Sequence, residues 1–109
     1  MGTENNRPEW YLGARPAKLG GTIYSLQSWP TYFAATQART KRHEIRNQVE
    51  AGITFKTGDF LELLEYDPNT KTYTGEKLFV KVTFISPTGT AWVVPGYAYM
   101  SIKVIDPLV

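Results

Sequence analysis

The sequence predicts a single α+β domain whose five or six strands curl into a small barrel, with one or two short helices. Three observations support this prediction. The chain has 109 residues, of which 42% are hydrophobic and 14% aromatic, so it carries enough apolar material for one core. Several short runs alternate apolar and polar residues and are separated by turn signals, as strands are. One short segment combines a helix start signal with good helix formers.

The first 22 residues predict a mostly irregular arm, followed by a domain that spans residues 23–109. The arm contains two prolines, four glycines and no apolar period, so neither a helix nor a strand is specified there. Trp10, Tyr11 and Leu12 are the exception, because an apolar cluster of this kind is costly to leave in water. We expect it to dock on the domain's own core, with a protein partner as the alternative.

A first strand is predicted over residues 23–26, where apolar and polar residues alternate. Ser28 is expected to be the N-cap of a helix over residues 30–39, which has a proline in its first turn and about two to three turns in all. The aromatic side chains that this segment has to bury are Trp29, Tyr32 and Phe33.

A β-hairpin is predicted in the second half of the chain. Thr57–Gly58–Asp59 is a strong turn signal just ahead of a strand over residues 60–66. The hairpin loop begins at Asp67 and closes near Gly75, and residues 77–85 return as the partner strand.

Two connections and a last strand complete the predicted elements. Residues 47–57 have a loop-like pattern, and residues 92–94 form either a short strand or an ordered loop. Residues 97–105 alternate as a strand does, with an apolar side made of Ala98, Met100, Ile102 and Val104.

The densest chemical constellation is Thr40–Arg46, which holds four basic or potentially basic side chains and one carboxylate. In a strand, Arg42, Glu44 and Arg46 share one face, and Lys41, His43 and Ile45 share the other. Ile45 is expected to mark the core side, which also makes His43 a packed or half-buried residue. The face with two arginines and a carboxylate could then hold a phosphate, a carboxylate or a base edge. The alternative is a solvated face with modest salt bridges.

Composition narrows the classes of function. The chain has no cysteine and one histidine, so thiol catalysis and histidine-rich metal sites are not available, and we expect neither a metal nor a cofactor. No apolar run reaches the roughly 20 residues of a membrane span, so we expect a cytoplasmic protein with no membrane partner. Residues 1–56 carry eight Lys or Arg against four Asp or Glu, which suits a polyanionic partner.

The order of these elements resembles the ASCH domain, named for activating signal cointegrator homology, whose fold belongs to the PUA-like barrels. The resemblance covers roughly residues 23–105. It extends to the small bacterial and phage members of the family, most of which have no assigned function. The motifs that carry it are Trp29–Pro30–x–Tyr32–Phe33, Lys41–x–x–Glu44–Ile45–Arg46, Thr57–Gly58–Asp59, Glu65–Tyr66–Asp67–Pro68 and Tyr97–x–x–Met100–Ser101–Ile102–Lys103.

This resemblance implies a module that binds single-stranded RNA or a nucleotide in a basic groove between the helix and the barrel. Arg46 and Arg42 would pair with phosphate, Lys41 would lie at the mouth, and Glu44 would complete the polar row. An unpaired base would stack on one of three aromatic side chains, Trp29, Tyr32 and Tyr97, each of which has a core position as its alternative.

A second interpretation is an amidohydrolase, since some small ASCH proteins remove the acetyl group from acetylated cytidine with a lysine, a threonine and a distant glutamate. Lys41 matches that lysine, whereas the two threonines of the motif fall at Arg42 and Glu44. No acidic residue lies between Glu76 and Asp106 to serve as the distant glutamate. Glu44 could act as the base and Lys41 could polarise a carbonyl, but their opposite strand parity argues against a shared target.

A third interpretation is a protein-interaction or regulatory module that binds a partner through the N-terminal arm and the loop around Trp92. Exposed aromatic side chains in loops are good interface anchors.

Because the pairing of Lys41 with Glu44 is as easily a salt bridge as a catalytic pair, binding is favoured over catalysis.

Overall fold

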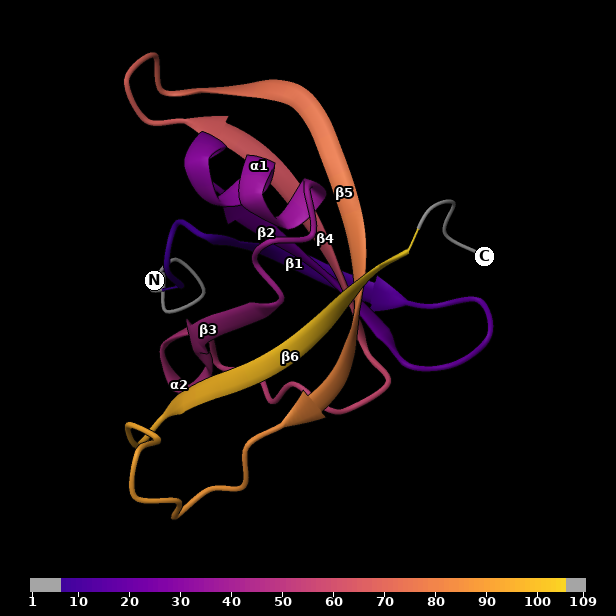
Figure 1. Ribbon diagram of the computed structural model, residues 1–109, viewed down its shortest axis with the longest axis vertical. Coiled ribbons are helices and arrows are strands. Elements are labelled where there is room, and N and C mark those ends of the chain that lie inside the picture. Colours follow the sequence, from indigo (N-terminus) through magenta and orange to yellow (C-terminus); the bar gives the residue numbers. More distant parts are fainter. Residues whose placement is uncertain (1–6, 106–109) are drawn as a thin grey trace, which may run out of the picture.

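One six-stranded sheet, in the order β1-β2-β4-β5-β6-β3, curls around a single core in the computed structural model, which describes residues 7–105 (Figure 1). The prediction of a small α+β barrel-like domain with two short helices is confirmed. The strands are β1 Tyr11–Pro16, β2 Thr22–Ser28, β3 His43–Asn47, β4 Phe60–Asp67, β5 Thr72–Ile85 and β6 Tyr97–Ile105, and the helices are α1 Pro30–Gln37 and α2 Gln48–Ala51.

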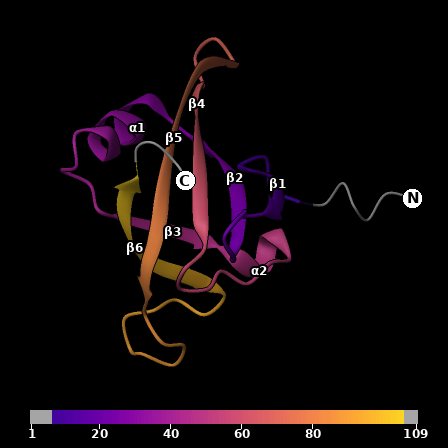
Figure 2. The same ribbon diagram turned by 90° about the vertical axis from the view of Figure 1, so that its right-hand side faces the viewer.

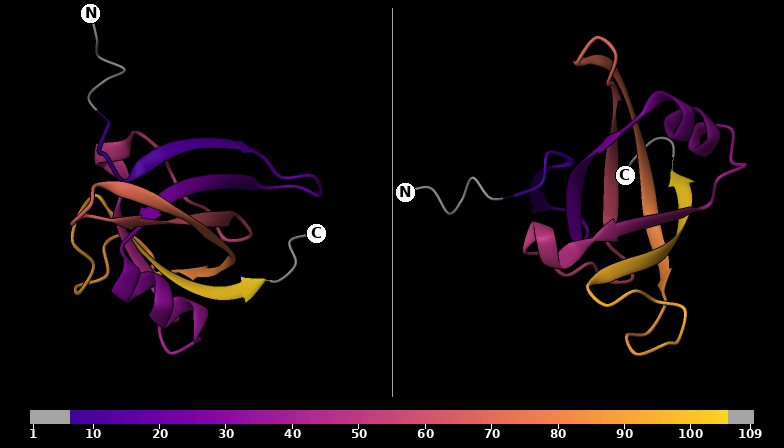
Figure 3. Two further views of the ribbon diagram at one scale, coloured as in Figure 1. Left: turned by 90° about the horizontal axis from the view of Figure 1, so that it is seen from above. Right: turned by 90° about the vertical axis from the view of Figure 1, so that its left-hand side faces the viewer.

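The sheet does not close on itself, because β1 and β3 are its two edges (Figure 2). Viewed from above, the strands wrap around the core and leave β1 and β2 on the side opposite β6 (Figure 3). Neighbouring strands are antiparallel except β2 and β4, which pair in parallel from Ile23–Phe60 to Ser28–Glu65. A parallel pair needs a crossover, and this crossover contains α1, β3 and α2.

The core forms from the inward-facing residues of the curled sheet. Side chains on successive strand residues alternate between the two faces, and core residues of β4, β5 and β6 are spaced two apart, as Leu61 and Leu63, Val80 and Val82, and Met100 and Ile102 show. The largest fully buried apolar side chains are Leu26, Leu61, Leu63, Val80, Val82 and Met100. Phe33 and Thr36 of α1 cover one end of this core, and α1 packs on β4.

The prediction of an irregular arm over residues 1–22 is wrong for residues 11–16, which form the edge strand β1. This strand pairs with β2 from Tyr11–Leu26 to Pro16–Thr22, and its register shifts between Tyr11 and Gly13. The strand forms because Tyr11 is buried in the core, with Trp10 packed against it, as the docking prediction expects. Leu12 stays exposed, and residues 1–6 of the predicted arm lie outside the described residues.

The beginning of the helix also differs from its prediction. Trp29, not Ser28, is the N-cap of α1, and no side chain caps the helix there. Ser28 is the last residue of β2 and pairs with Glu65 of β4, so the sheet fixes its side chain in the interior. The helix ends at Gln37 instead of residue 39, because Arg39 takes a left-handed conformation with φ 65°.

The rest of the chain follows its predictions closely, with two differences. The turn before β4 and the strand over residues 97–105 are confirmed, and Asp59 holds that turn by accepting from the backbone N–H of Lys56 at 2.8 Å. The returning strand of the hairpin begins at Thr72, earlier than predicted, so the loop is shorter. Residues 48–51 form α2 within the predicted loop. Of the two alternatives for residues 92–94, a short strand or a loop, the structure has the loop.

Candidate functional site

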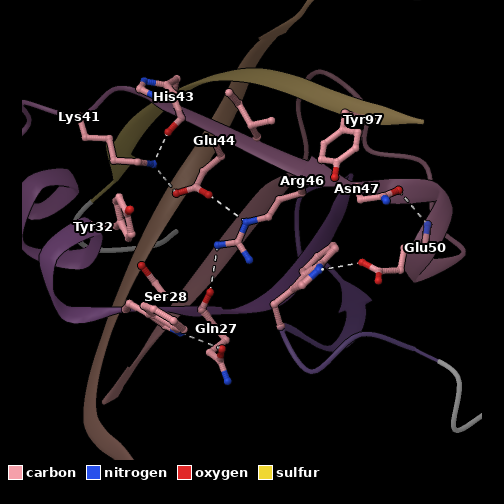
Figure 4. Close-up of a pocket in the computed structure, with 13 residues that line it drawn as sticks. Gln27, Ser28, Tyr32, Lys41, His43, Glu44, Arg46, Asn47, Glu50 and Tyr97 are labelled. Carbon is pink, nitrogen blue, oxygen red and sulfur yellow. Dashed lines mark hydrogen bonds and ion pairs between the residues drawn. The ribbon is translucent and has the colours of Figure 1, made fainter. Parts of the chain in front are cut away.

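A pocket of about 530 Å³ lies where the edge strand β3 approaches the β1–β2 hairpin and the start of α1 (Figure 4). It occupies the open side of the curled sheet, where side chains rather than backbone hydrogen bonds connect the strands. The residues that line it are Trp10, Gln27, Ser28, Trp29, Tyr32, Lys41, His43, Glu44, Ile45, Arg46, Asn47, Glu50 and Tyr97.

Strand β3 places Glu44 and Arg46 in the pocket, on the face that was predicted to look into a groove, but Glu44 is also buried there. The strand pairs only with β6, and Glu44 lies opposite Met100. Glu44 is 4% exposed whereas Ile45 is 45% exposed, so the prediction that Ile45 marks the core side is wrong. The inward position can hold the carboxylate of Glu44 because two cations compensate its charge.

Lys41, Glu44 and Arg46 form a buried ionic network, which we call the triad. Lys41 Nζ lies 2.7 Å from Glu44 Oε2, and Arg46 Nε lies 3.0 Å from Glu44 Oε1. The side chains are 16%, 5% and 13% exposed respectively, so all three are largely removed from water. Lys41 Nζ also donates to the backbone carbonyl of His43. With two cations and one carboxylate, the triad carries one excess positive charge.

The contact between Lys41 and Glu44 corrects the argument from strand parity. Lys41 precedes the first residue of β3, so the alternation of side chains in the strand does not apply to it. Its side chain folds back toward the same carboxylate that Arg46 contacts, and Figure 4 shows the two cations on opposite sides of Glu44. Lys41 and Glu44 are therefore placed to contact the same ligand.

Arg46 connects β3 with β2 across the pocket. Its Nη2 donates to the backbone carbonyl of Gln27 in β2 at 3.0 Å, and its guanidinium carbon lies 5.1 Å from the centre of the Trp10 ring. Trp10 in turn donates from Nε1 to Glu50 Oε1 at 3.4 Å. The guanidinium plane is thus fixed from three directions, by a carboxylate, a carbonyl and an aromatic face.

The aromatic residues predicted for stacking all line the pocket. Trp29 and Tyr32 are 49% and 56% exposed, and Tyr97 is partly exposed. Trp29 is positioned by a hydrogen bond from its Nε1 to Gln27 Oε1 at 3.3 Å. These rings leave apolar faces accessible next to a charged floor, an arrangement that differs from the core positions that were their alternative.

Arg42 and His43 do not take the places that the sequence indicated. Arg42 is exposed and does not line the pocket. Its Nε donates at 2.9 Å to the backbone carbonyl of Arg39, the residue in the left-handed conformation. His43 lines the pocket but is exposed, so the prediction of a packed or half-buried histidine is wrong. Only the backbone carbonyl of His43 joins the triad.

Ser28 lines the pocket, a position that its predicted role as a helix cap did not anticipate. Its residue is 3% exposed, and its hydroxyl has no hydrogen-bond partner in the described part of the chain. A buried hydroxyl without a partner is costly, so such groups usually have a functional explanation. In Figure 4 the hydroxyl lies across the pocket from the triad.

A second charged cluster lies on the outer face of the sheet, away from the pocket. Glu62 accepts from Arg15 Nη1 at 3.0 Å and from Ser25 Oγ at 2.7 Å, and Lys77 Nζ is 3.8 Å away. Burial alone would raise the pKa of Glu62, but the hydrogen bonds from Arg15 and Ser25, together with the charges of Arg15 and Lys77, lower it below the ordinary value of 4.5. None of these four residues lines the pocket described above.

The pocket residues that sequence reasoning missed are mainly those from distant elements. Trp10, Gln27, Asn47 and Glu50 enter it because β1, β2 and α2 converge on β3, which no local pattern reveals. Asn47 does carry a local signal, since its side chain accepts from the backbone N–H of Glu50 at 3.0 Å and caps α2.

Within residues 7–105, no group of three or more His, Asp or Glu side chains is placed to hold a metal ion. None of the helices in this range is long and apolar enough to cross a membrane.

Comparison with curated proteins gives no match to this chain. Residues 23–102 match a family model described as "Domain of unknown function (DUF3850)". The matched segment contains β2 through most of β6 and hence the triad, Ser28 and the aromatic walls. Because this segment makes up most of the chain, the protein belongs to the DUF3850 family.

Proposed function

We propose that this domain binds single-stranded RNA or a nucleotide of the cytoplasm, with an unpaired base held in the pocket. The observation that carries the proposal is the buried triad at the floor of a pocket whose walls are exposed aromatic rings. Fixed hydrogen-bonding groups can recognise the edge of a base, and an aromatic ring that stacks on its face contributes about 1–3 kcal/mol. The resemblance to ASCH domains of the PUA-like group supports the same ligand class.

The charge of the triad favours an anionic group beside it. The triad holds two cations against one carboxylate, while Glu50, which accepts a hydrogen bond from Trp10, brings the pocket lining as a whole to two cations and two carboxylates. A phosphate next to the base would offset the excess charge of the triad, with the exposed His43 in the lining of the pocket. The volume of about 530 Å³ is in the range of pockets that hold small organic ligands.

The proposal is tested by an amide NMR titration of the full chain with nucleoside monophosphates and short single-stranded RNAs. Saturable shifts confined to β3, the end of β2 and the start of α1 are expected. Trp29→Ala should weaken binding about tenfold, because it removes one stacking wall. Trp92→Ala is the matched control, since Trp92 is 73% exposed and does not line the pocket. Equal losses in both variants would contradict the proposal.

A second candidate function is hydrolysis of an acetylated cytidine, which the 2.7 Å contact between Lys41 and Glu44 favours. Water would add to the acetyl carbonyl while Glu44 takes its proton and Lys41 stabilises the oxyanion, and the proton would leave with the amine to give acetate and cytidine. Release of acetate that stops in Lys41→Ala would establish this activity. A wild-type protein that releases none would exclude it.

A protein partner remains the third proposal. Trp92 is its most exposed aromatic anchor, whereas Tyr11 and Trp10 are already packed on the domain. Trp92→Ala therefore serves both as the control above and as the variant that should abolish capture of such a partner.

A further inference from the structure

The triad has a defined hydrogen-bonding capacity left after its internal contacts. An ammonium group has three donors, and Lys41 uses two of them on Glu44 and on the carbonyl of His43. A guanidinium has five donors, and Arg46 uses one on Glu44 and one on the carbonyl of Gln27. Both N–H groups of Arg46 Nη1 have no acceptor within residues 7–105. Each cation can thus still donate to a ligand.

Glu44 lies between these donors and can only accept. Lys41 occupies one position on Oε2 and Arg46 one position on Oε1, and each carboxylate oxygen accepts a second hydrogen bond. Because Lys41 and Arg46 lie on opposite sides of Glu44, the edge that the triad presents runs donor, acceptor, donor (Figure 4). The contacts that fix this order also hold it rigid.

The complement of that edge is acceptor, donor, acceptor, which is the imide edge of uracil: two carbonyl oxygens on either side of an N–H. We propose that the pocket selects a uracil base, with its N3–H donated to Glu44 and its two carbonyls accepting from Lys41 and Arg46. This inference rests on the proposed nucleotide-binding function and names the base that the same site takes. The aromatic walls would hold the faces of the ring.

The other bases match this edge less completely. Cytosine can donate an amino hydrogen to Glu44 and accept at N3 from one cation, which leaves the second cation without an acceptor. Adenine has the acceptors N1 and N7 on the two sides of its amino group, but both are set back from the amino nitrogen, whereas the two carbonyl oxygens of uracil lie level with its N3. Guanine offers a carbonyl and an N–H in the right order, but its amino group then meets a cation that also donates. A buried donor that loses its acceptor is the main source of discrimination between similar ligands.

Ser28 gives the pocket a second polar contact on the side away from the triad. Its hydroxyl can donate or accept, and it has no partner in the described residues, so a polar atom of the ligand is free to satisfy it. This group does not distinguish the bases by itself, but it indicates that the pocket is built for a ligand with polar atoms on two sides.

The first test uses the wild-type full chain and isothermal titration calorimetry with uridine, cytidine, adenosine and guanosine 5′-monophosphates. Uridine monophosphate should bind about tenfold more tightly than each of the others. The decisive ligand is 3-methyluridine monophosphate, whose methyl group removes the single imide donor and should weaken binding at least about tenfold. Equal affinity for uridine and 3-methyluridine monophosphates would overturn the inference while nucleotide binding stands. No binding of any nucleotide would overturn the proposed function and the inference with it.

The second test uses the variants Glu44→Gln and Glu62→Gln, which are chemically matched. Both carboxylates are buried and paired with two cations, but only Glu44 lines the pocket. Glu44→Gln replaces part of the acceptor with a donor, so the preference for uridine over cytidine monophosphate should disappear, and Glu62→Gln should retain it. Retention of the preference in a folded Glu44→Gln protein would also overturn the inference.

The imide edge of uracil is present both in a free nucleotide and in an RNA strand. A tetranucleotide of uridines that binds more tightly than uridine monophosphate would identify the strand as the ligand, and equal affinities would identify the nucleotide. Either result supports the selection of uracil, whereas an oligocytidine that binds as tightly as the oligouridine would contradict it.

Discussion

Replacing Glu44 by alanine should destabilise the domain by about 3 kcal/mol, which is large for a protein of this size. The substitution removes the only side-chain acceptor shared by Lys41 and Arg46, whose side chains are 16% and 13% exposed. Breaking a buried ion pair from one side costs about 3–5 kcal/mol, because a charge is left without compensation. The lower end applies here, since both cations keep a backbone carbonyl as a partner.

Glu62→Ala is the internal control, because it removes an equally buried carboxylate from more exposed cations. Arg15 and Lys77 are 48% and 57% exposed, so water replaces the lost partner and the cost should be about 1 kcal/mol. Urea unfolding at pH 7, followed by tryptophan fluorescence, measures both free energies. The midpoint for Glu44→Ala should fall by about 1–3 M below that of the wild type. Similar costs for the two variants would refute the argument that the triad is desolvated.

A triple variant separates stability from recognition at this site. Replacing the triad with apolar residues of similar size, as in Lys41→Met with Glu44→Leu and Arg46→Met, removes all three charges together. Such replacements are often neutral or stabilising by about 1–4 kcal/mol. The triple variant should therefore be more stable than Glu44→Ala and should bind no nucleotide. A triple variant that still binds uridine monophosphate would show that the triad does not form the ligand site.

Three further predictions concern other parts of the domain. Ser28→Ala should raise the free energy of unfolding by about 1 kcal/mol, because it removes a buried hydroxyl without a partner, and should weaken nucleotide binding about fivefold; a loss of stability in urea would contradict this. Gly21→Ala should cost more than Gly20→Ala by about 1 kcal/mol in the same assay. Both glycines have positive φ, but only at Gly21 would a Cβ meet a backbone oxygen, that of Gly58, at 2.9 Å. For Glu62, whose pKa is lowered in the folded protein, the stabilising contribution is present above pH 4.5 and is lost as the pH falls through the lower folded value. Glu62→Gln should therefore flatten the loss of stability below pH 4.5 in acid unfolding curves, and an unchanged slope would exclude this role.

The elements that the sequence predicts well are those whose signals are local. Residues 60–66 are rich in apolar residues and follow a strong turn signal, and residues 97–105 place apolar side chains at every second position, so both strands follow from local signals. Strand β1 was missed because Gly13 and Pro16 weaken its pattern, and it exists only through pairing with β2 and the burial of Tyr11. Tertiary contacts override weak local preference in this segment.

The prediction that Glu44 and Arg46 face a groove agrees with the structure, whereas Arg42 lies outside the pocket and the core side of β3 was predicted wrongly. The rule that apolar side chains face inward assigned Ile45 to the core, and it fails because the inner face of β3 looks into a charged pocket instead of an apolar core. The parity of a strand likewise could not place Lys41, which lies before the strand begins. No feature near residue 46 signals that Trp10 will stack on Arg46, because 36 positions of sequence separate them.

The position of β3 in the sheet has a consequence for how the protein is made. Most of the pocket residues lie in the first half of the sequence, yet within residues 7–105 β3 pairs only with β6, which follows the other five strands of the sheet in sequence. During translation, the segment with Glu44 and Arg46 has no strand to pair with until residues 97–105 leave the ribosome. Non-local pairing of this kind delays folding. A nascent chain that already displays β1 to β5 should therefore lack any ligand affinity, and the capacity to bind should arise only at the last step of assembly.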